Sequence, residues 1–371
     1  MTKPYGSISS DPIEIANILN NQFASVFVDD SNVPLPPFEP RTNQVLSSLD
    51  ISRDMVFNLL IKLDHNKSQG IDNIHSYILA ETASSICIPL QQIFRKSLSQ
   101  GALPSSWLKA NVTPLPKSGN RTVASNYRPI SLTSVPCKLM EKLVKTVIMS
   151  HLTNQNLLSE KQHGFVSNKA CITNLIETSD FLTSNIAKKI SVDMILLDFA
   201  KAFDKVPHKR LILKLSNYGI QGELLDWIRS FLFGRKQRVV LGSSISDWTD
   251  VTSSVPQGSI LGPTLFIIYI NDLVDSLSNP SLLYADDTKV FGKISPANPH
   301  LDSSNLQQDI DKINDWTQIW MMSLNVSKCK VMHFGRKNPR TSYFLNGHEL
   351  VKTEAERDLG LQLTTDLKFS R

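Results

Sequence analysis

The sequence has few cysteines and no long apolar run, and each shortage excludes a class of protein. Its 371 residues include only 4 cysteines, which are widely spaced and form no Cys-x-x-Cys pair. A disulfide framework or a zinc site is therefore not expected, and the protein is expected in a reducing compartment. The polar residues 1–10 lack the apolar core of a signal peptide. The apolar stretch at residues 265–270 is far too short to span a membrane. The expected location is intracellular, in the nucleus and/or cytoplasm, and not secreted.

Acidic residues are missing from one long segment. The whole chain has 39 Lys and Arg against 34 Asp and Glu, a net charge of only +5. Between Glu81 and Glu141, however, there is no carboxylate, and the cations of this segment are Arg95, Lys96, Lys109, Lys117, Arg121, Arg128 and Lys138. A surface with one sign of charge suits a polyanion such as nucleic acid. A solvated basic face explains the same run equally well.

The composition and the residue patterns indicate a globular protein of the α+β class. Hydrophobic residues make up 41% and charged residues 20%, and the length is sufficient for two or three subdomains. The first hundred residues read as mostly helical, with Asp11 as an N-cap, Glu14 as its capping-box partner and Ser52 as a second N-cap. Later segments alternate between helical and extended patterns, with a buried strand at residues 192–197 and a hairpin at 238–251. Strands in runs with helices between them favour an α+β fold.

Two segments carry acids in unusual settings. Asp198 directly follows the strand expected at 192–197, which is apolar apart from Asp193, although an Asp at a strand end can also simply cap the next helix. Asp286 and Asp287 lie between two apolar strand halves, which predicts a hairpin with both acids at its tip. A surface turn is the alternative. Adjacent like charges repel, so a cation would stabilise the pair, and carboxylate oxygens suit Mg²⁺.

A third segment, residues 255–263, reads Val-Pro-Gln-Gly-Ser-Ile-Leu-Gly-Pro before an apolar helix. Its glycines allow a nucleotide or a template strand to approach the backbone, whereas a structural loop at a helix start is the alternative. If the strands of Asp198 and Asp286 meet in one sheet, these acids can hold two metal ions about 4 Å apart, one to activate a 3′-hydroxyl and the other to support the leaving pyrophosphate.

In this order, the segments at 197–204, 255–263 and 282–291 resemble the A, B and C motifs of reverse transcriptases. The flanking segments narrow the resemblance to the LINE-type (non-LTR), jockey-like retrotransposons. These are residues 67–72, 107–110, 126–132 and 162–165, a D-motif segment at 324–330, and residues 358–361, which resemble the start of the thumb. The resemblance covers nearly the whole chain.

The resemblance implies a right-hand polymerase with a truncated thumb. Its parts would be a mostly helical N-terminal extension (1–102), fingers (103–191), a palm with the catalytic core (192–335) and the start of the thumb (336–371), so that Arg371 falls inside the thumb. The implied reaction is RNA-directed DNA synthesis, in which dNTPs are added to a DNA primer on an RNA template. The implied cofactor is a pair of Mg²⁺ ions, with Mn²⁺ as the alternative ion. The sequence names no protein partner.

The resemblance also implies a role for each matching residue. Asp198 and Asp286 would be the main metal ligands and Asp287 the third acid. The residues implied in nucleotide binding are Lys117 and Arg128 on the triphosphate, Phe199, Ala200, Phe203 under the sugar, and Gln257 and Gly258, which also position the template. Lys328 would protonate the leaving pyrophosphate. For Phe203 and Lys328, a core aromatic and a surface lysine are the alternatives.

The sequence departs from the family pattern at three positions. Ser254 stands where relatives usually have Gly, Val166 where Arg is common, and Ala170 where Ser is common. These changes bear on template grip and processivity rather than on the acids. Together with the short thumb they motivate a second interpretation, a catalytically silent nucleic-acid-binding relic of such an element. An RNA-templated RNA polymerase is a third, which Phe203 disfavours because its ring would clash with a ribose 2′-hydroxyl.

Overall fold

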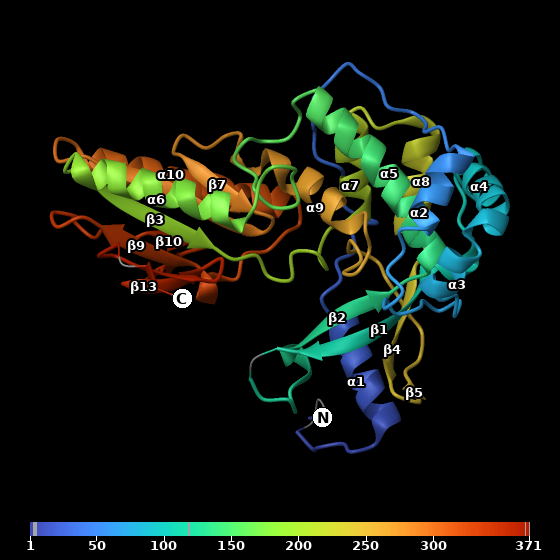
Figure 1. The fold of residues 1–371 in the computed structure, drawn as a ribbon. Helices are drawn as coiled ribbons and strands as arrows, with labels where there is room; N and C mark the ends of the chain where they lie inside the picture. Colours follow the sequence, from blue (N-terminus) through green and yellow to red (C-terminus); the bar gives the residue numbers. More distant parts are fainter. Residues whose placement is uncertain (3–5, 118, 368, 371) are drawn as a thin grey trace. The chain divides into compact units, whose positions relative to one another are not determined.

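The computed structural model describes residues 1–2, 6–117, 119–367 and 369–370. Helices and strands alternate along these residues, which confirms the α+β prediction (Figure 1). The chain forms two compact units. The first unit is Met1–Leu157 with Phe203–Leu265, and the second unit is Leu158–Ala202 with Phe266–Arg371. The limits expected for fingers, palm and thumb do not coincide with these units and stay predictions, and Arg371 lies outside the described residues.

The first unit combines a group of helices with one small sheet. Its elements are α1 (Pro12–Ala24), α2 (Arg53–Leu60), α3 (Ser76–Glu81), α4 (Ala83–Ser99), β1 (Lys109–Pro116), β2 (Tyr127–Leu132), α5 (Val135–Asn154), α7 (His208–Asn217), α8 (Gly222–Leu232), β4 (Lys236–Leu241), β5 (Ser244–Ile245) and β6 (Thr249–Asp250). The apolar helix α9 (Gly262–Ile270) contains the limit between the two units.

Both predicted N-caps are confirmed, but the capping box is wrong. The Asp11 carboxylate accepts hydrogen bonds from the N–H groups of Ile13 and Glu14, each at 3.3 Å. Ser52 Oγ accepts one from Met55 N–H at 3.1 Å. In the capping box, Glu14 would accept from Asp11 N–H. That N–H instead donates to Ser9 Oγ at 3.3 Å, and the Ser9 hydroxyl donates to Glu14 at 2.5 Å. The side chain of Ser9 therefore stands between the two predicted partners.

The sheet of the first unit has one covered face and one open face. Its strand order is β2-β1-β4-β5, with β6 also on β4, and β1 runs antiparallel to β2 but parallel to β4. The hairpin of β4 and β5 confirms the predicted one, although its second half is divided into β5 and β6. Helix α1 lies against the sheet (Figure 1), where Leu19 and Phe23 pack with Val112 and Val239.

The second unit is built on a five-stranded sheet with the buried run at its centre. Its elements are α6 (Cys171–Ala187), β3 (Ser191–Leu197), β7 (Ser281–Tyr284), β8 (Asp287–Ile294), α10 (Pro299–Ile319), β9 (Lys330–Phe334), β10 (Phe344–Leu345), β11 (His348–Glu349), β12 (Val351–Lys352), β13 (Ala355–Asp358), β14 (Leu361–Thr364) and β15 (Phe369–Ser370). The strand order is β12-β9-β3-β8-β7, with β3 antiparallel to both neighbours.

Helices α6 and α10 pack on opposite faces of this sheet. The ring of Phe181 in α6 lies 5.0 Å from that of Phe291 in β8. A Cβ atom on the next residue, Gly292, would lie 2.7 Å from Leu306 of α10. Consecutive residues of a strand point to opposite faces, so the two helices enclose β3 and β8 between them.

Over the described ranges, no helix is both long enough and apolar enough to cross a membrane. The four cysteines are all free thiols, and three of them are buried.

Candidate active site

The acids of two predicted motifs meet at one end of the second unit's sheet. Strand β3 pairs with β8 so that Leu197 lies opposite Thr288, which makes Asp198 the residue next to Asp287. Asp287 also pairs with Tyr284, so Ala285 and Asp286 form the two-residue turn between β7 and β8. The predicted hairpin with both acids at its tip is therefore confirmed, while the metal-binding role of the acids is a separate question.

Lys328 lies against the first of these acids. Its Nζ atom is 3.3 and 3.4 Å from the two carboxylate oxygens of Asp198. The short helix Val326–Lys328 holds it there, since Asn325 N–H donates to the backbone oxygen of Asp198 at 2.7 Å. The Lys328 side chain is 63% exposed and that of Asp198 33%. An ion pair this exposed contributes little stability, so another cation can replace Lys328 beside Asp198.

The pKa of Asp287 is raised by its surroundings, which include two other acids. Burial of its carboxyl group, followed by repulsion from Asp286 and Asp198, raises the pKa of Asp287 to about 6. Because the folded chain binds this proton more tightly than the unfolded chain, the associated stability is lost as the pH rises through about 6. A cation bound among the ionised acids would offset the repulsion that contributes to this loss.

The donor set fits a hard divalent cation. Carboxylate oxygens with open positions for substrate oxygens are what Mg²⁺ takes in nucleotide-processing sites. Among the described residues, no group of three or more His, Cys, Asp or Glu side chains already has the arrangement of a metal site. Asp198 contacts Lys328 instead. The fit therefore rests on the type of the donors and on the repulsion among them.

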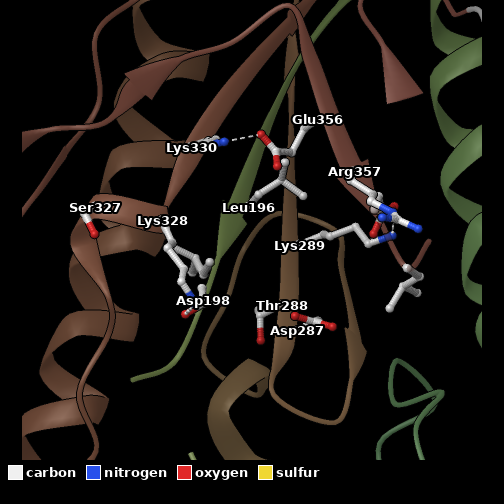
Figure 2. Close-up of a pocket in the computed structure, with 13 residues that line it drawn as sticks. Leu196, Asp198, Asp287, Thr288, Lys289, Ser327, Lys328, Lys330, Glu356 and Arg357 are labelled. Atoms are coloured by element: carbon white, nitrogen blue, oxygen red, sulfur yellow. Dashed lines mark hydrogen bonds and ion pairs between the residues drawn. The ribbon is translucent and has the colours of Figure 1, made fainter. Parts of the chain in front are cut away.

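A cavity of about 350 Å³ opens in front of Asp198 and Asp287. Figure 2 shows both acids at one end of it, with Lys328 beside Asp198. The opposite wall comes from β13 and the residue after it, and includes Glu356 and Arg357. The cavity thus joins the acids to the segment whose sequence resembles the start of the thumb.

A buried lysine in this cavity was not anticipated from the sequence. Lys289 is 1% exposed, forms an ion pair with Asp358 of β13, and donates to Thr178 Oγ1 of α6 at 3.1 Å. It thereby ties the β7–β8 hairpin to two other elements. A signal was present, because a lysine between Thr288 and Val290 of an apolar strand needs a carboxylate partner. The sequence did not say which one.

Phe199 and Ala200 follow Asp198 but face different surroundings from those expected. Phe199 is 4% exposed, and its ring meets the edge of Trp316 at 6.5 Å. Ala200 N–H donates to the backbone oxygen of Ser323 at 2.8 Å. The Phe199 ring belongs to the core, so its predicted nucleotide contact would have to be made by its backbone.

The Pro-Gln-Gly loop is held by contacts within the first unit. Gln257 donates from Nε2 to the Asp204 carboxylate at 2.8 Å, and its backbone oxygen accepts from Ser131 N–H at 2.7 Å. Gly258 has φ +113°, and a Cβ atom there would lie 2.5 Å from the backbone oxygen of Ser131. These contacts alone account for the glycine, which favours the structural-loop alternative for Gly258 without testing its predicted role at the nucleotide. Phe203 is half-buried, and its carbonyl accepts from Val255 N–H at 2.9 Å.

Lys117 and Arg128 lie beside and in the sheet of the first unit, respectively. Lys117 follows β1 and is exposed, and Arg128 is an exposed residue of β2. Arg128 lies opposite Leu115 of β1, which shares a strand face with Lys109. Because Val112 points to the covered face, Lys109, Leu115 and the paired residue Arg128 point to the open face.

An aromatic side chain joins the cations of this open face. The guanidinium carbon of Arg238 lies 4.5 Å from the ring centre of Trp248, and Lys109 Nζ lies 5.6 Å from it. Arg238 also donates to Asn111 Oδ1 at 2.9 Å. Cations around an exposed indole are typical of surfaces that bind single-stranded nucleic acid, through phosphate contacts and base stacking.

Ser254, the residue that replaces the usual glycine, has a backbone that favours glycine. Its φ is +104°, although it is an L-residue with a side chain. The conformation is fixed from both sides, since Ser254 N–H donates to Val206 and its carbonyl accepts from His208 Nε2 at 2.9 Å. The departure from the family pattern therefore coincides with backbone strain.

We expect Ser254→Gly to stabilise the protein by about 1 kcal/mol, because glycine adopts this φ without the strain of a Cβ atom. The midpoint of urea unfolding measures the change. Ser243→Gly is the matched control, since Ser243 is exposed and is not among the positive-φ residues. An equal response of both variants would contradict the strain at Ser254.

Comparison with known proteins places these motifs in a family. The model described as "Reverse transcriptase (RNA-dependent DNA polymerase)" matches residues 115–362. The chain is 28% identical over 333 residues to the "RNA-directed DNA polymerase from mobile element jockey" of Drosophila melanogaster. It is 26% identical over 348 residues to the "Probable RNA-directed DNA polymerase from transposon X-element" of the same organism.

These alignments cover most of this chain but a minor part of the relatives. They include 86% and 92% of this chain, and 36% of each relative. A third relative, "Probable RNA-directed DNA polymerase from transposon BS" of Drosophila melanogaster, is 25% identical over an alignment of 391 positions, which covers 99% of this chain and 42% of that protein. The chain thus spans less than half the length of these proteins.

Proposed function

Because this chain belongs to the reverse transcriptase (RNA-dependent DNA polymerase) family, we propose that it is the polymerase core of a LINE-type, jockey-like (non-LTR) retrotransposon. The reaction is transfer of a nucleotide from dNTP to a DNA primer 3′-end on an RNA template. One observation carries the proposal, namely that β3 and β8 place Asp198 next to Asp287 at the mouth of the cavity.

Asp198, Asp286 and Asp287 would hold two Mg²⁺ ions, with Mn²⁺ as the alternative. When bound, such ions activate the 3′-hydroxyl and support the leaving pyrophosphate. The residues of the chain position the reactants, and little covalent work is left to them. Lys328, whose Nζ lies 3.3 Å from an Asp198 oxygen, would donate a proton to the departing pyrophosphate, as the resemblance implies.

The remaining assignments follow the resemblance. Residues 103–191, 192–335 and 336–371 would act as fingers, palm and start of the thumb, with residues 1–102 as an N-terminal extension. Arg128 and Lys117 would contact the triphosphate, and Phe203 would exclude a 2′-hydroxyl. Gln257, Gly258 and the backbone around Ala200 would complete the nucleotide site. The location proposed is intracellular, in the nucleus and/or cytoplasm.

The direct test is extension of a DNA primer on an RNA template with dNTPs and Mg²⁺. Extension by the wild-type chain supports the proposal. Binding of primer–template without any extension, at all metal and pH conditions, would leave the silent relic as the better description. Incorporation of ribonucleotides at the same rate as dNTPs would instead favour an RNA polymerase.

We expect the open sheet face to bind phosphate groups. Arg238→Ala and Lys109→Ala should each weaken binding of single-stranded RNA and reduce the slope of log affinity against log salt by about 1 for each phosphate group that is no longer neutralised. Fluorescence anisotropy with labelled RNA at several salt concentrations measures both. Lys62→Ala, an exposed lysine after α2, is the control. An unchanged slope for both variants would remove this face from the binding surface.

A further inference from the structure

The turn that carries the second acid has an unfavourable backbone conformation. Ala285 has φ +54° and is 4% exposed, and the next residue is Asp286. A left-handed φ in a residue other than glycine costs free energy and persists only where the surroundings fix it. Other contacts must therefore keep the turn in this shape.

One buried amide side chain provides such contacts. Gln162 is 1% exposed, and its Oε1 accepts from Ala285 N–H at 2.9 Å and from Gly164 N–H at 2.7 Å. Both partners are donors, which assigns the oxygen rather than the nitrogen of the amide to this position. The side chain therefore fixes the N–H that begins the turn.

The backbone beside Gln162 aligns the same segment. His163 N–H donates to the carbonyl of Leu283 at 2.8 Å, and Leu283 N–H donates to that of Lys161 at 2.9 Å, so residues 161–163 extend the edge of β7. Gly164 closes the contact, because a Cβ atom there would lie 2.4 Å from the Ala285 nitrogen. The segment and the turn fit together only in this register.

We propose that Gln162 is a positioning residue of the polymerase site, which holds the Ala285–Asp286 turn so that Asp286 and Asp287 face Asp198. This inference rests on the proposed function. Gln162 acts on the turn through its hydrogen bonds to the N–H groups of Ala285 and Gly164. It gives a physical role to the segment at residues 162–165, which sequence resemblance alone left without one.

Removing the acceptor is expected to slow the reaction without weakening substrate binding. Gln162→Leu should lower kcat for primer extension by about 10²-fold and leave the KM for dNTP nearly unchanged, because the acids are displaced but the nucleotide surface is not. Gln162→Glu keeps an oxygen at both hydrogen bonds and should recover the rate to within about tenfold of the wild type. A purely structural loss would reduce the active fraction in both variants alike.

The backbone strain supplies a second variant. Glycine adopts φ +54° freely, so the turn then needs less help from Gln162. Adding Ala285→Gly to Gln162→Leu should raise kcat about tenfold above that of Gln162→Leu alone. A double variant that is slower than Gln162→Leu would contradict the role of the strain.

Hydrogen exchange tests the same interaction without any catalysis. Deuterium uptake of peptides spanning residues 282–288 should rise in Gln162→Leu and stay near the wild-type level in Gln162→Glu. Gln91→Leu, which removes a side-chain bond of 2.7 Å to the Ile51 carbonyl in the first unit, is the matched control. Its uptake at 282–288 should not change.

The outcomes separate this inference from the proposed function. If the wild type does not extend a primer, the proposed function fails, and the exchange pattern alone still decides whether Gln162 holds the turn. If the wild type extends and Gln162→Leu matches it in kcat, or if uptake at 282–288 is the same in both, the positioning role of Gln162 is overturned.

Discussion

Replacing Asp286 with alanine is expected to lower primer extension by at least about 10²- to 10³-fold, the effect of removing one preorganised group from a charged transition state. The reason is electrostatic. Asp286 lies in the turn directly before Asp287, and its charge already contributes to raising the pKa of Asp287 to about 6. Binding of primer–template should persist, since the phosphate groups are bound by basic residues.

A measurement without substrate separates metal binding from loss of fold. Mg²⁺ should raise the melting temperature of the wild type, and more at pH 8 than at pH 5, because ligands must be deprotonated to bind and Asp287 has a pKa of about 6. Asp286→Ala should lose most of this increase.

Asp315→Ala serves as the control for this measurement, since Asp315 is an exposed acid of α10 in the same unit. It should retain both the Mg²⁺ response and extension. Wild-type extension rates in Asp286→Ala would contradict the metal-binding role of Asp286.

The parts of this site that could be predicted from sequence are those with a local pattern. The apolar residues before Asp198 predict a buried strand, and the structure has one, β3, with β8 and β9 on its two sides. The two apolar strand halves on either side of Asp286 and Asp287 predict a hairpin, and the structure has one. The meeting of Asp198 with the hairpin acids then required only that both strands belong to one sheet.

The contacts that fix the site depend on partners far along the chain, and no periodicity records those. Gln162 lies more than a hundred residues before Ala285, yet its side chain accepts a hydrogen bond from the Ala285 N–H. Glu141 shows the same limit. It ends the acid-free segment, yet it is fully buried and accepts from Ile260 and Leu261 N–H at 2.7 and 3.0 Å. A polar residue on a helix reads as solvated until its partner is known.

The Lys289–Asp358 pair gives the largest stability effect expected in the second unit. Lys289→Met should destabilise this unit by about 3 to 5 kcal/mol, because it leaves the Asp358 carboxylate buried without a counter-charge. The two residues are 1% and 6% exposed. Urea unfolding followed by tryptophan fluorescence measures the loss, since Trp316 and Trp320 both belong to this unit.

Two further variants make the result interpretable. Lys293→Met changes an exposed lysine of the same strand, whose Nζ lies 5.4 Å from the centre of the Phe181 ring, and should cost no more than about 1 kcal/mol. The double variant Lys289→Met with Asp358→Leu should recover most of the stability, because replacing both members of a buried pair by apolar residues is often nearly neutral. A double variant as unstable as Lys289→Met would show that packing, not charge, explains the loss.

The same double variant addresses why a charged pair stands in this core. The Asp358 charge raises the pKa of Asp287, and the Lys289 charge lowers it by a smaller amount. Removing the pair should therefore lower the pKa of Asp287, so that Mg²⁺-dependent stabilisation begins at a lower pH than in the wild type. A protein that regains its stability and responds to Mg²⁺ at this lower pH would show that the pair acts on Asp287 as well as on the fold. An unchanged pH dependence would assign the pair to joining β8 and β13 alone.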